Sequence, residues 1–192
     1  HGQTSASINA TSAEQARILV EFPIDSIVSD ISDGTVPSSS VQYRLKMFNA
    51  PHAESVPYAY TLKVSMMSKS WTEGRGLDME TFLDTGSSNW ISASDGVAWT
   101  SEGGDYYGTN YTASFDIGCE DIELDISSLV GEWIDELNTA GTGKPNYGVI
   151  VKLTPSLESA SFSTYTKEFF GRGTEYFFKK PHIEVRFNDS IT

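Results

Sequence analysis

The sequence predicts a mainly β fold, an antiparallel β-sandwich or jelly roll with one short helix near residues 127–138. Three observations lead to this fold class. Several short segments alternate apolar and polar residues with a period of two, which is typical of half-buried strands. Turn-forming residues separate these segments, since the chain holds 16 glycines and 7 prolines. A single segment places its apolar residues convincingly at the spacing of a helix.

The first third of the chain contains four predicted elements. A short apolar run at 17–22 has the length of a strand, and the isoleucines and valine of 24–31 fit a helical turn. Residues 41–48 then alternate apolar and polar side chains, which predicts a half-buried strand. The same alternation over 58–66 is the clearest strand signal in the sequence.

The later part of the chain adds short strands around the helix. Residues 111–115 and 122–126 read as extended, and Ser127 or Ser128 can cap the helix that follows. This helix places its apolar residues on one face: Leu129, Val130, Trp133, Ile134 and Leu137. Further strands are predicted at 147–153, 175–178 and 182–187.

We expect one domain over residues 16–192, because 192 residues fit a single sandwich core. Residues 1–15 are rich in Ser, Ala and Thr and hold little to bury, so they predict an extended N-terminal arm. Residues 70–111 are rich in glycine and tryptophan, and they predict a long ordered loop region crossed by short strands.

Composition excludes several classes of partner and site. The formal net charge is −13, from 13 Lys and Arg against 26 Asp and Glu, and this charge would repel the phosphate backbone of a nucleic acid. No apolar stretch approaches the ~20 residues that a membrane-spanning helix needs. A single cysteine, Cys119, excludes an internal disulfide, and we expect a buried, unreactive thiol there. Three scattered histidines leave no metal site of the His/Cys type.

The strongest catalytic motif is Asp84-Thr85-Gly86, which resembles the active-site loop of pepsin-like aspartic proteases. Such proteases need two carboxylates that share one proton. The sequence holds no second Asp-Thr-Gly or Asp-Ser-Gly, so a turn built from Asp, Gly and Ser is the favoured interpretation and the protease a remote one. No other motif in the sequence predicts catalysis, and we expect that the protein is not an enzyme.

Calcium is the only cofactor that the sequence leaves open. Asp95, Glu102 and Asp105 lie among glycine-rich turns whose exposed carbonyls could complete an oxygen site, although their spacing fits no EF-hand.

The tryptophans are the most distinctive residues. Trp71, Trp90, Trp99 and Trp133 are bulky side chains that favour a structural cluster fixing the 70–111 region. The alternative is a carbohydrate-binding platform formed by Trp90, Trp99 and Tyr106, with or without bound calcium.

A series of short motifs runs along most of the chain. It comprises Trp71-Thr72-Glu73-Gly74-Arg75-Gly76, then Trp90, Trp99 and Gly103-Gly104-Asp105-Tyr106, then Asp125-Ile126 before the helix, and Asn146-Tyr147-Gly148. In this order, from about Ala16 to Asn188, the series resembles the DNRLRE-type jelly-roll domains, in a version similar to structural proteins of tailed (marine) phages. The Arg-rich signature that names the family is absent.

This resemblance implies a non-enzymatic structural component of a virion or an extracellular assembly. A capsid-surface, neck or tail protein would act through contacts with other virion proteins and with repeated copies of itself. The same family is related to carbohydrate-binding modules, so the resemblance also implies the alternative of a secreted glycan-binding or adhesion module.

Overall fold

The computed structural model describes residues 15–52, 58–74, 86–159 and 167–188. Within these ranges the chain is mainly β, with antiparallel sheets and only short helices, which confirms the predicted fold class. Residues 1–14 of the predicted arm lie outside the described residues. The strands are β1 (Ile18–Val20), β2 (Gln42–Met47), β3 (Tyr60–Met67), β4 (Ser92–Ser94), β5 (Val97–Ala98), β6 (Tyr106–Phe115), β7 (Ile122–Asp125), β8 (Val149–Leu153) and β9 (His182–Arg186). The helices are α1 (Asp25–Ser32), α2 (Ser127–Asn138), α3 (Pro155–Glu158) and the 3₁₀-helix η1 (Phe177–Lys179).

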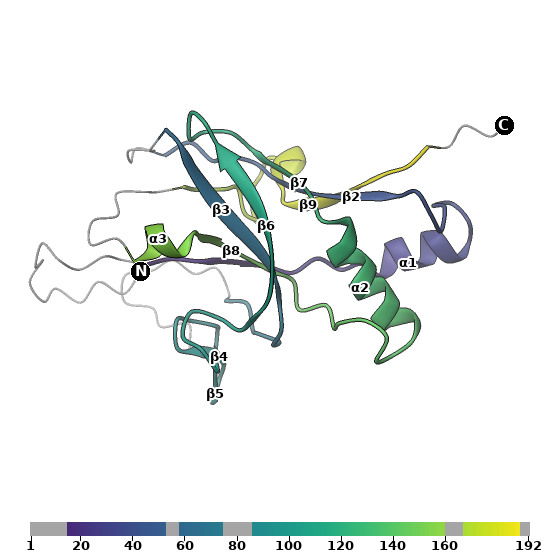
Figure 1. Ribbon diagram of the computed structural model, residues 1–192, viewed down its shortest axis with the longest axis horizontal. Coiled ribbons are helices and arrows are strands. Elements are labelled where there is room, and N and C mark those ends of the chain that lie inside the picture. Colours follow the sequence, from purple (N-terminus) through teal and green to yellow (C-terminus); the bar gives the residue numbers. More distant parts are fainter. Residues whose placement is uncertain (1–14, 53–57, 75–85, 160–166, 189–192) are drawn as a thin grey trace, which may run out of the picture.

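Two antiparallel sheets form the body of the molecule (Figure 1). The four-stranded sheet has the order β1-β8-β3-β6, the three-stranded sheet has the order β7-β2-β9, and β4 and β5 form a separate hairpin. The chain changes sheet between β1, β2 and β3, and again between β6, β7, β8 and β9. These crossings tie both sheets to one core, as a sandwich requires. The narrower jelly-roll topology stays a prediction.

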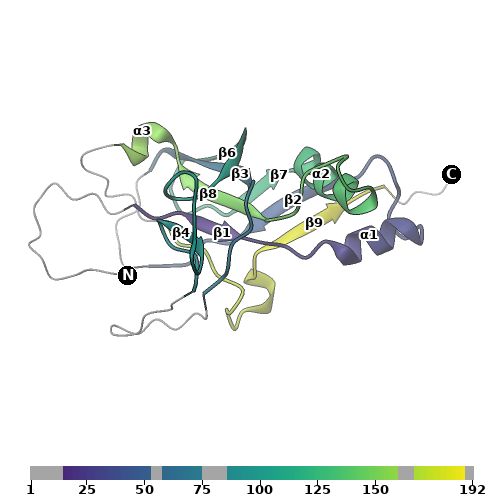
Figure 2. The same cartoon turned by 90° about the horizontal axis from the view of Figure 1, so that it is seen from below.

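The main core lies between the two sheets. Inward residues of β2 and β3 alternate with outward ones as the sequence predicts, and Leu45 and Val64 are fully buried. Helix α2 closes one end of this core with Leu129, Val130 and Trp133 (Figure 2). Burial of a large apolar side chain stabilises the fold by about 2 kcal/mol, so each of these residues contributes substantially to stability.

A second, smaller core lies on the opposite face of the four-stranded sheet. Met67 of β3 and Ile150 of β8 point outward there and pack with Ala93 and Trp99, which belong to the segment that carries the hairpin. All four are buried because the β4–β5 segment covers the sheet. The sheet is therefore packed on both faces at this place, which explains why the last four residues of β3 are all buried.

The N-terminus of α2 differs from the predicted cap. The helix begins at Ser127 as predicted, but neither Ser127 nor Ser128 caps it with its side chain. Instead Asp125 accepts hydrogen bonds from the N–H and the hydroxyl of Ser127, and the Ser127 hydroxyl oxygen accepts the backbone N–H of Tyr43. Ser127 thus joins the helix to β2, which sequence spacing could not show.

The predicted strand at 175–178 is wrong. The structure forms η1 there, after Tyr176 and before Lys180. Its successive aromatic residues would need a sheet buried on both faces, whereas β9 already pairs with the free edge of β2.

Cys119 also differs from expectation, because its thiol is exposed. Strand β6 ends at Phe115, and the chain turns beyond it, where Glu120 accepts the backbone N–H groups of Asp116 and Ile117. The strand therefore ends four residues before Cys119, and the thiol does not share the burial of the strand.

Candidate functional site

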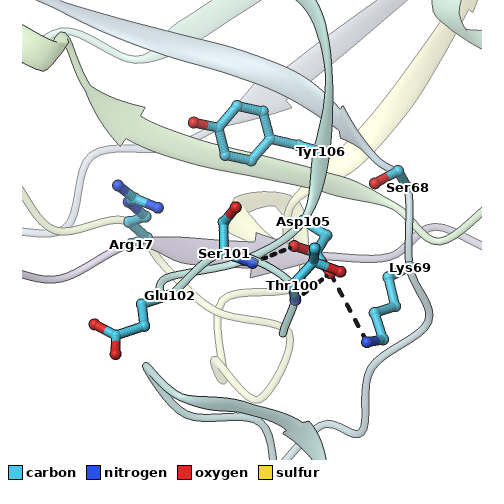
Figure 3. Close-up of a pocket in the computed structure, with 9 residues that line it drawn as sticks. Arg17, Ser68, Lys69, Thr100, Ser101, Glu102, Asp105 and Tyr106 are labelled. Carbon is cyan, nitrogen blue, oxygen red and sulfur yellow. Dashed lines mark hydrogen bonds and ion pairs between the residues drawn. The ribbon is translucent and has the colours of Figure 1, made fainter. Parts of the chain in front are cut away.

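A polar pocket of about 660 Å³ lies on the outer side of the four-stranded sheet, next to the second core (Figure 3). Three segments far apart in sequence form it: the residue before β1, the end of β3, and the loop that leads into β6. Its lining combines hydroxyls, one aromatic ring and charges of both signs, contributed by Arg17, Ser68, Lys69, Thr100, Ser101, Glu102, Gly104, Asp105 and Tyr106.

Asp105 fixes the conformation of the 100–105 loop, which forms one side of the pocket. Its carboxylate accepts the backbone N–H groups of Thr100 (2.8 Å) and Ser101 (2.9 Å), and Lys69 approaches to 3.8 Å. Partial burial raises the pKa of Asp105, but these donors and the lysine outweigh burial and hold the pKa below its ordinary value. The carboxylate is therefore a fixed, ionised acceptor that fastens the turn.

Arg17 forms the opposite wall and ties three segments together. Its guanidinium makes two hydrogen bonds to the Glu158 carboxylate (2.8 and 2.9 Å) and donates to the Gly103 carbonyl oxygen (2.9 Å). The same group lies 4.7 Å from the centre of the Trp90 ring. Such a bidentate pair is strongly oriented, so Arg17 positions the 100–105 loop and is not a freely moving ligand-binding group.

Tyr106, which lines the pocket, contacts the buried side chain of Lys152. The ammonium group of Lys152 donates to the Tyr106 hydroxyl oxygen and lies 4.0 Å from the ring centre. Lys152 is only 6% exposed on a sheet face that is otherwise apolar nearby. The aromatic ring and hydroxyl thus shield a charge that would be costly to bury alone.

Of the residues predicted to bind carbohydrate, the structure places one in this pocket. Tyr106 lines it, whereas Trp90 packs beneath Arg17. Trp99 is 7% exposed in the second core, and its indole N–H donates to the Asn89 carbonyl oxygen at 2.8 Å. The Trp99 ring is therefore not available for stacking on a sugar in this conformation.

The predicted tryptophan cluster is divided between two cores. Trp99 belongs to the second core and Trp71 packs against it, with an indole N–H bond to the Tyr147 carbonyl oxygen. Trp133 lies in the main core, and Trp90 packs against the guanidinium of Arg17. Sequence reasoning missed Arg17, Lys69 and Lys152, since a single Lys or Arg carries no signal for the loop it will meet.

Two of the three calcium candidates line the pocket. Glu102 and Asp105 do, while Asp95 lies in the turn between β4 and β5. Both oxygens of Asp105 already accept backbone N–H groups. Across the described ranges, no group of three or more His, Cys, Asp or Glu side chains could hold a metal ion.

The remote protease prediction cannot be placed on the structure. Asp84 and Thr85 lie outside the described residues, and Gly86 is the first residue of the motif that the structure describes. The sequence still offers no second Asp-Thr-Gly or Asp-Ser-Gly.

A second candidate site is an exposed aromatic segment, defined as Tyr176–Lys180. Phe177 is 73% exposed and Phe178 is 85% exposed, and their rings contact each other edge to face at 5.4 Å. Tyr176 packs against Phe170, and the ammonium of Lys179 lies 5.0 Å from the centre of the Phe48 ring. The segment is thus anchored at both ends while its two phenylalanines face solvent.

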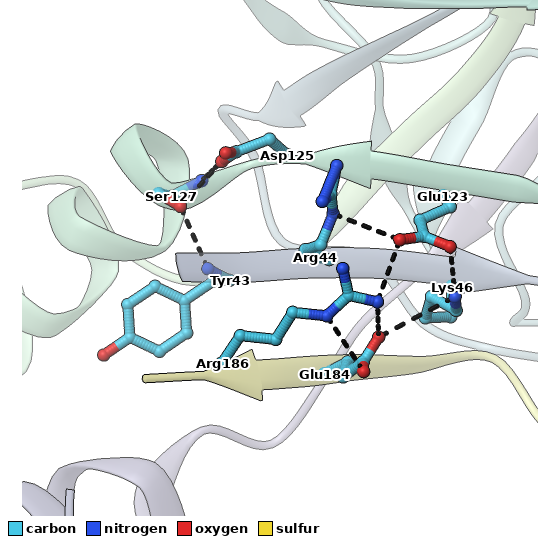
Figure 4. Close-up of polar contacts among 8 residues, drawn as sticks. All are labelled: Tyr43, Arg44, Lys46, Glu123, Asp125, Ser127, Glu184 and Arg186. Carbon is cyan, nitrogen blue, oxygen red and sulfur yellow. Dashed lines mark hydrogen bonds and ion pairs between the residues drawn. The ribbon is translucent and has the colours of Figure 1, made fainter. Parts of the chain in front are cut away.

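The outer face of the three-stranded sheet is charged, in contrast. Arg44 and Lys46 of β2 alternate along the face with Glu123 of β7 and with Glu184 and Arg186 of β9 (Figure 4). Glu123 contacts all three basic side chains, at 2.6 Å for Lys46, 2.9 Å for Arg186 and 3.5 Å for Arg44. Such cross-strand pairs suit a face in contact with water.

The chain matches no protein-family model, no curated protein and no solved structure. Among the described helices, none has the length and apolar character needed to cross a bilayer.

Proposed function

We propose that this protein is a non-enzymatic building block of a multi-copy protein assembly and that the aromatic segment Tyr176–Lys180 is its contact surface. On the resemblance to phage structural proteins, the assembly would be a virion, with an extracellular assembly as the alternative setting. The observation that carries the proposal is the exposure of Phe177 and Phe178 side by side on an anchored turn.

The exposure of these two phenylalanines favours a binding partner that covers them. Large aromatic residues at an exposed turn leave apolar surface in water, and they are the residue type most enriched at protein interfaces. Neither ring contributes to the two cores, so folding alone does not explain them. The charged outer face of the three-stranded sheet offers no comparable apolar surface.

Sedimentation velocity over a range of protein concentrations tests the proposal. We expect association that grows with concentration in the parent chain and is lost in the variant Phe177→Ser/Phe178→Ser. The control is Ile91→Ser, which removes another exposed apolar side chain, 61% exposed and outside the segment. A parent chain that sediments as a monomer at every concentration would overturn the proposal.

The polar pocket favours a second candidate function, carbohydrate binding. Hydroxyls, fixed charges and the Tyr106 ring together supply the donors, acceptors and apolar surface that a sugar needs. A glycan array should then give a signal that falls in Glu102→Ala, which removes an exposed pocket side chain. Glu175→Ala, exposed and outside the pocket, is the control. Equal signals from both variants, or no signal from the parent, would contradict glycan binding.

A further inference from the structure

The aromatic segment and the two longer helices lie at opposite ends of the three-stranded sheet. Strand β9 begins at His182, opposite Lys46, directly after the segment, and it ends at Arg186, opposite Gln42. Helices α1 and α2 lie at the Gln42 end, because α1 precedes β2 and Ser127 of α2 bonds the backbone of Tyr43. In Figure 1 the short yellow coil of η1 lies near the start of β9, whereas α1 lies toward the other end of that strand.

The aromatic segment and the two helices carry charges of opposite sign. Residues 176–182 include Lys179 and Lys180 and no carboxylate, although the whole chain has a net charge of −13. Helices α1 and α2 together carry five carboxylates and no Lys or Arg: Asp25, Asp30, Glu132, Asp135 and Glu136. Within the described part of the chain, Asp25, Asp30 and Asp135 form no ion pair, whereas Glu132 pairs with Lys144 at 3.1 Å.

The helical end also keeps apolar surface uncovered. Helix α1 buries none of its residues fully, so Ile27, Val28 and Ile31 stay partly accessible. Leu137, at the end of α2, is 51% exposed. An apolar and acidic surface is the complement of an aromatic and basic turn.

We infer that the aromatic segment of one copy docks on the α1–α2 end of a second copy, in a head-to-tail contact. This inference rests on the proposed function and names the partner of its contact surface. Because the two patches differ, a pair of copies leaves one aromatic segment and one helical end free. Further copies bind there, and the assembly either closes into a ring or grows as an open filament. The phenylalanines supply the buried area, and Lys179 facing the helical carboxylates selects the partner and its orientation.

A charge-reversal experiment tests the partner surface by sedimentation velocity. Lys179→Glu should weaken self-association roughly tenfold, because like charges then meet at the contact. Asp30→Lys/Asp135→Lys, on the other side of the contact, should weaken it similarly. Lys63→Glu, on the four-stranded sheet, makes the same change in net charge as Lys179→Glu and should leave association unchanged.

Mixing the two reversed variants gives the decisive result. In the mixture, the glutamate introduced at position 179 of one variant can meet the lysines introduced at positions 30 and 135 of the other. The unchanged lysine and aspartates of the two variants can also meet, so association should recover to near the parent level. Recovery supports the inference.

The other outcomes separate this inference from the proposed function. If association depends on Phe177 and Phe178 but the charge reversals change nothing, or the mixture does not recover, the helical end is not the partner and the proposed function stands. If the parent never associates, both fail.

Discussion

Gly148 shows how closely β1 and β8 approach each other. Its φ is +78°, and a Cβ atom there would lie 2.2 Å from the Val20 carbonyl oxygen, which is part of the backbone and cannot move aside. Two separate constraints, a left-handed backbone and a close approach, therefore require glycine at the start of β8. Asn146 supports the same turn by accepting the Gly148 N–H at 3.0 Å.

Gly148→Ala should lower the free energy of unfolding by about 3 kcal/mol or more, because strain and a backbone clash add together. Gly34→Ala is the matched control: its φ is +83°, but nothing lies within 4 Å of the added atom, so we expect only about 1 kcal/mol. Urea denaturation of both variants measures the difference. Equal losses would show that the close approach of β1 to β8 is not as described.

Asp105 makes the pocket loop sensitive to acid. The folded-state pKa of Asp105 lies below its ordinary value of ~3.9, so its stabilising effect is present above that value and is lost as the pH falls through the folded pKa. Asp105→Asn cannot ionise, and the free energy of unfolding should therefore fall less steeply below about pH 4 than it does in the parent. Urea denaturation at several acidic pH values checks this, and parallel curves for parent and variant would contradict it.

For single residues, the sequence predicts whether a side chain is buried better than it predicts which side chain that residue contacts. The alternation of β2 and β3 is visible in the sequence, so Leu45 and Val64 are predictable as core residues. Lys152 falls at an outward position of β8 and looks solvent-exposed from spacing alone. Its burial depends on Tyr106, which lies 46 positions away and reaches it across the sheet. Contacts of this kind require the fold.

The four-stranded sheet is the central element, because it separates the two cores. Strand β3 pairs with β8 on one side and with β6 on the other, and it presents residues to both cores. Backbone hydrogen bonds join the β4–β5 segment to Thr72, beyond the end of β3: the Thr72 N–H donates to the Ala93 carbonyl oxygen, and the Ser88 N–H donates to the Thr72 carbonyl oxygen. Packing of Trp99 in the second core also stabilises this segment.

Trp99→Ala should release the β4–β5 segment while the main core stays folded. We expect a loss of about 3 kcal/mol, and hydrogen exchange should speed up mainly in residues 86–105. Leu45→Ala, in the main core, should instead speed up exchange throughout both sheets. If Trp99→Ala accelerates exchange in β2 as strongly as in the hairpin, the second core is not a separate cooperative unit.

The sequence predicted the strands with one face in water, and it also predicted β8, which is buried on both faces, but it was wrong at 175–178. Strands β2, β3 and β9 show the period of two, and the spacing of α2 is helical, so all four were predictable. The 175–178 segment has apolar residues in succession, which fits a buried strand as well as an exposed turn. Only the pairing of β9 with β2 decides between them.

The whole molecule has two cores and two unlike ends. The two sheets share one main core, and the second core stabilises a tryptophan-rich segment on the outer face. A net charge of −13 does not indicate a basic aromatic segment, because charge distribution depends on which residues the fold brings together. The contact surface, unlike the fold class, could therefore not be predicted from composition.

The central claim is that the exposed aromatic segment makes this protein a building block of an assembly. The most direct test is the size of the particle in solution as protein concentration rises, for the parent and for Phe178→Ser alone. Phe178 is 85% exposed, so the substitution should change the free energy of unfolding by less than about 0.5 kcal/mol. We predict growth with concentration in the parent and a weaker tendency to associate in the variant. Identical, strictly monomeric particles in both would contradict the account.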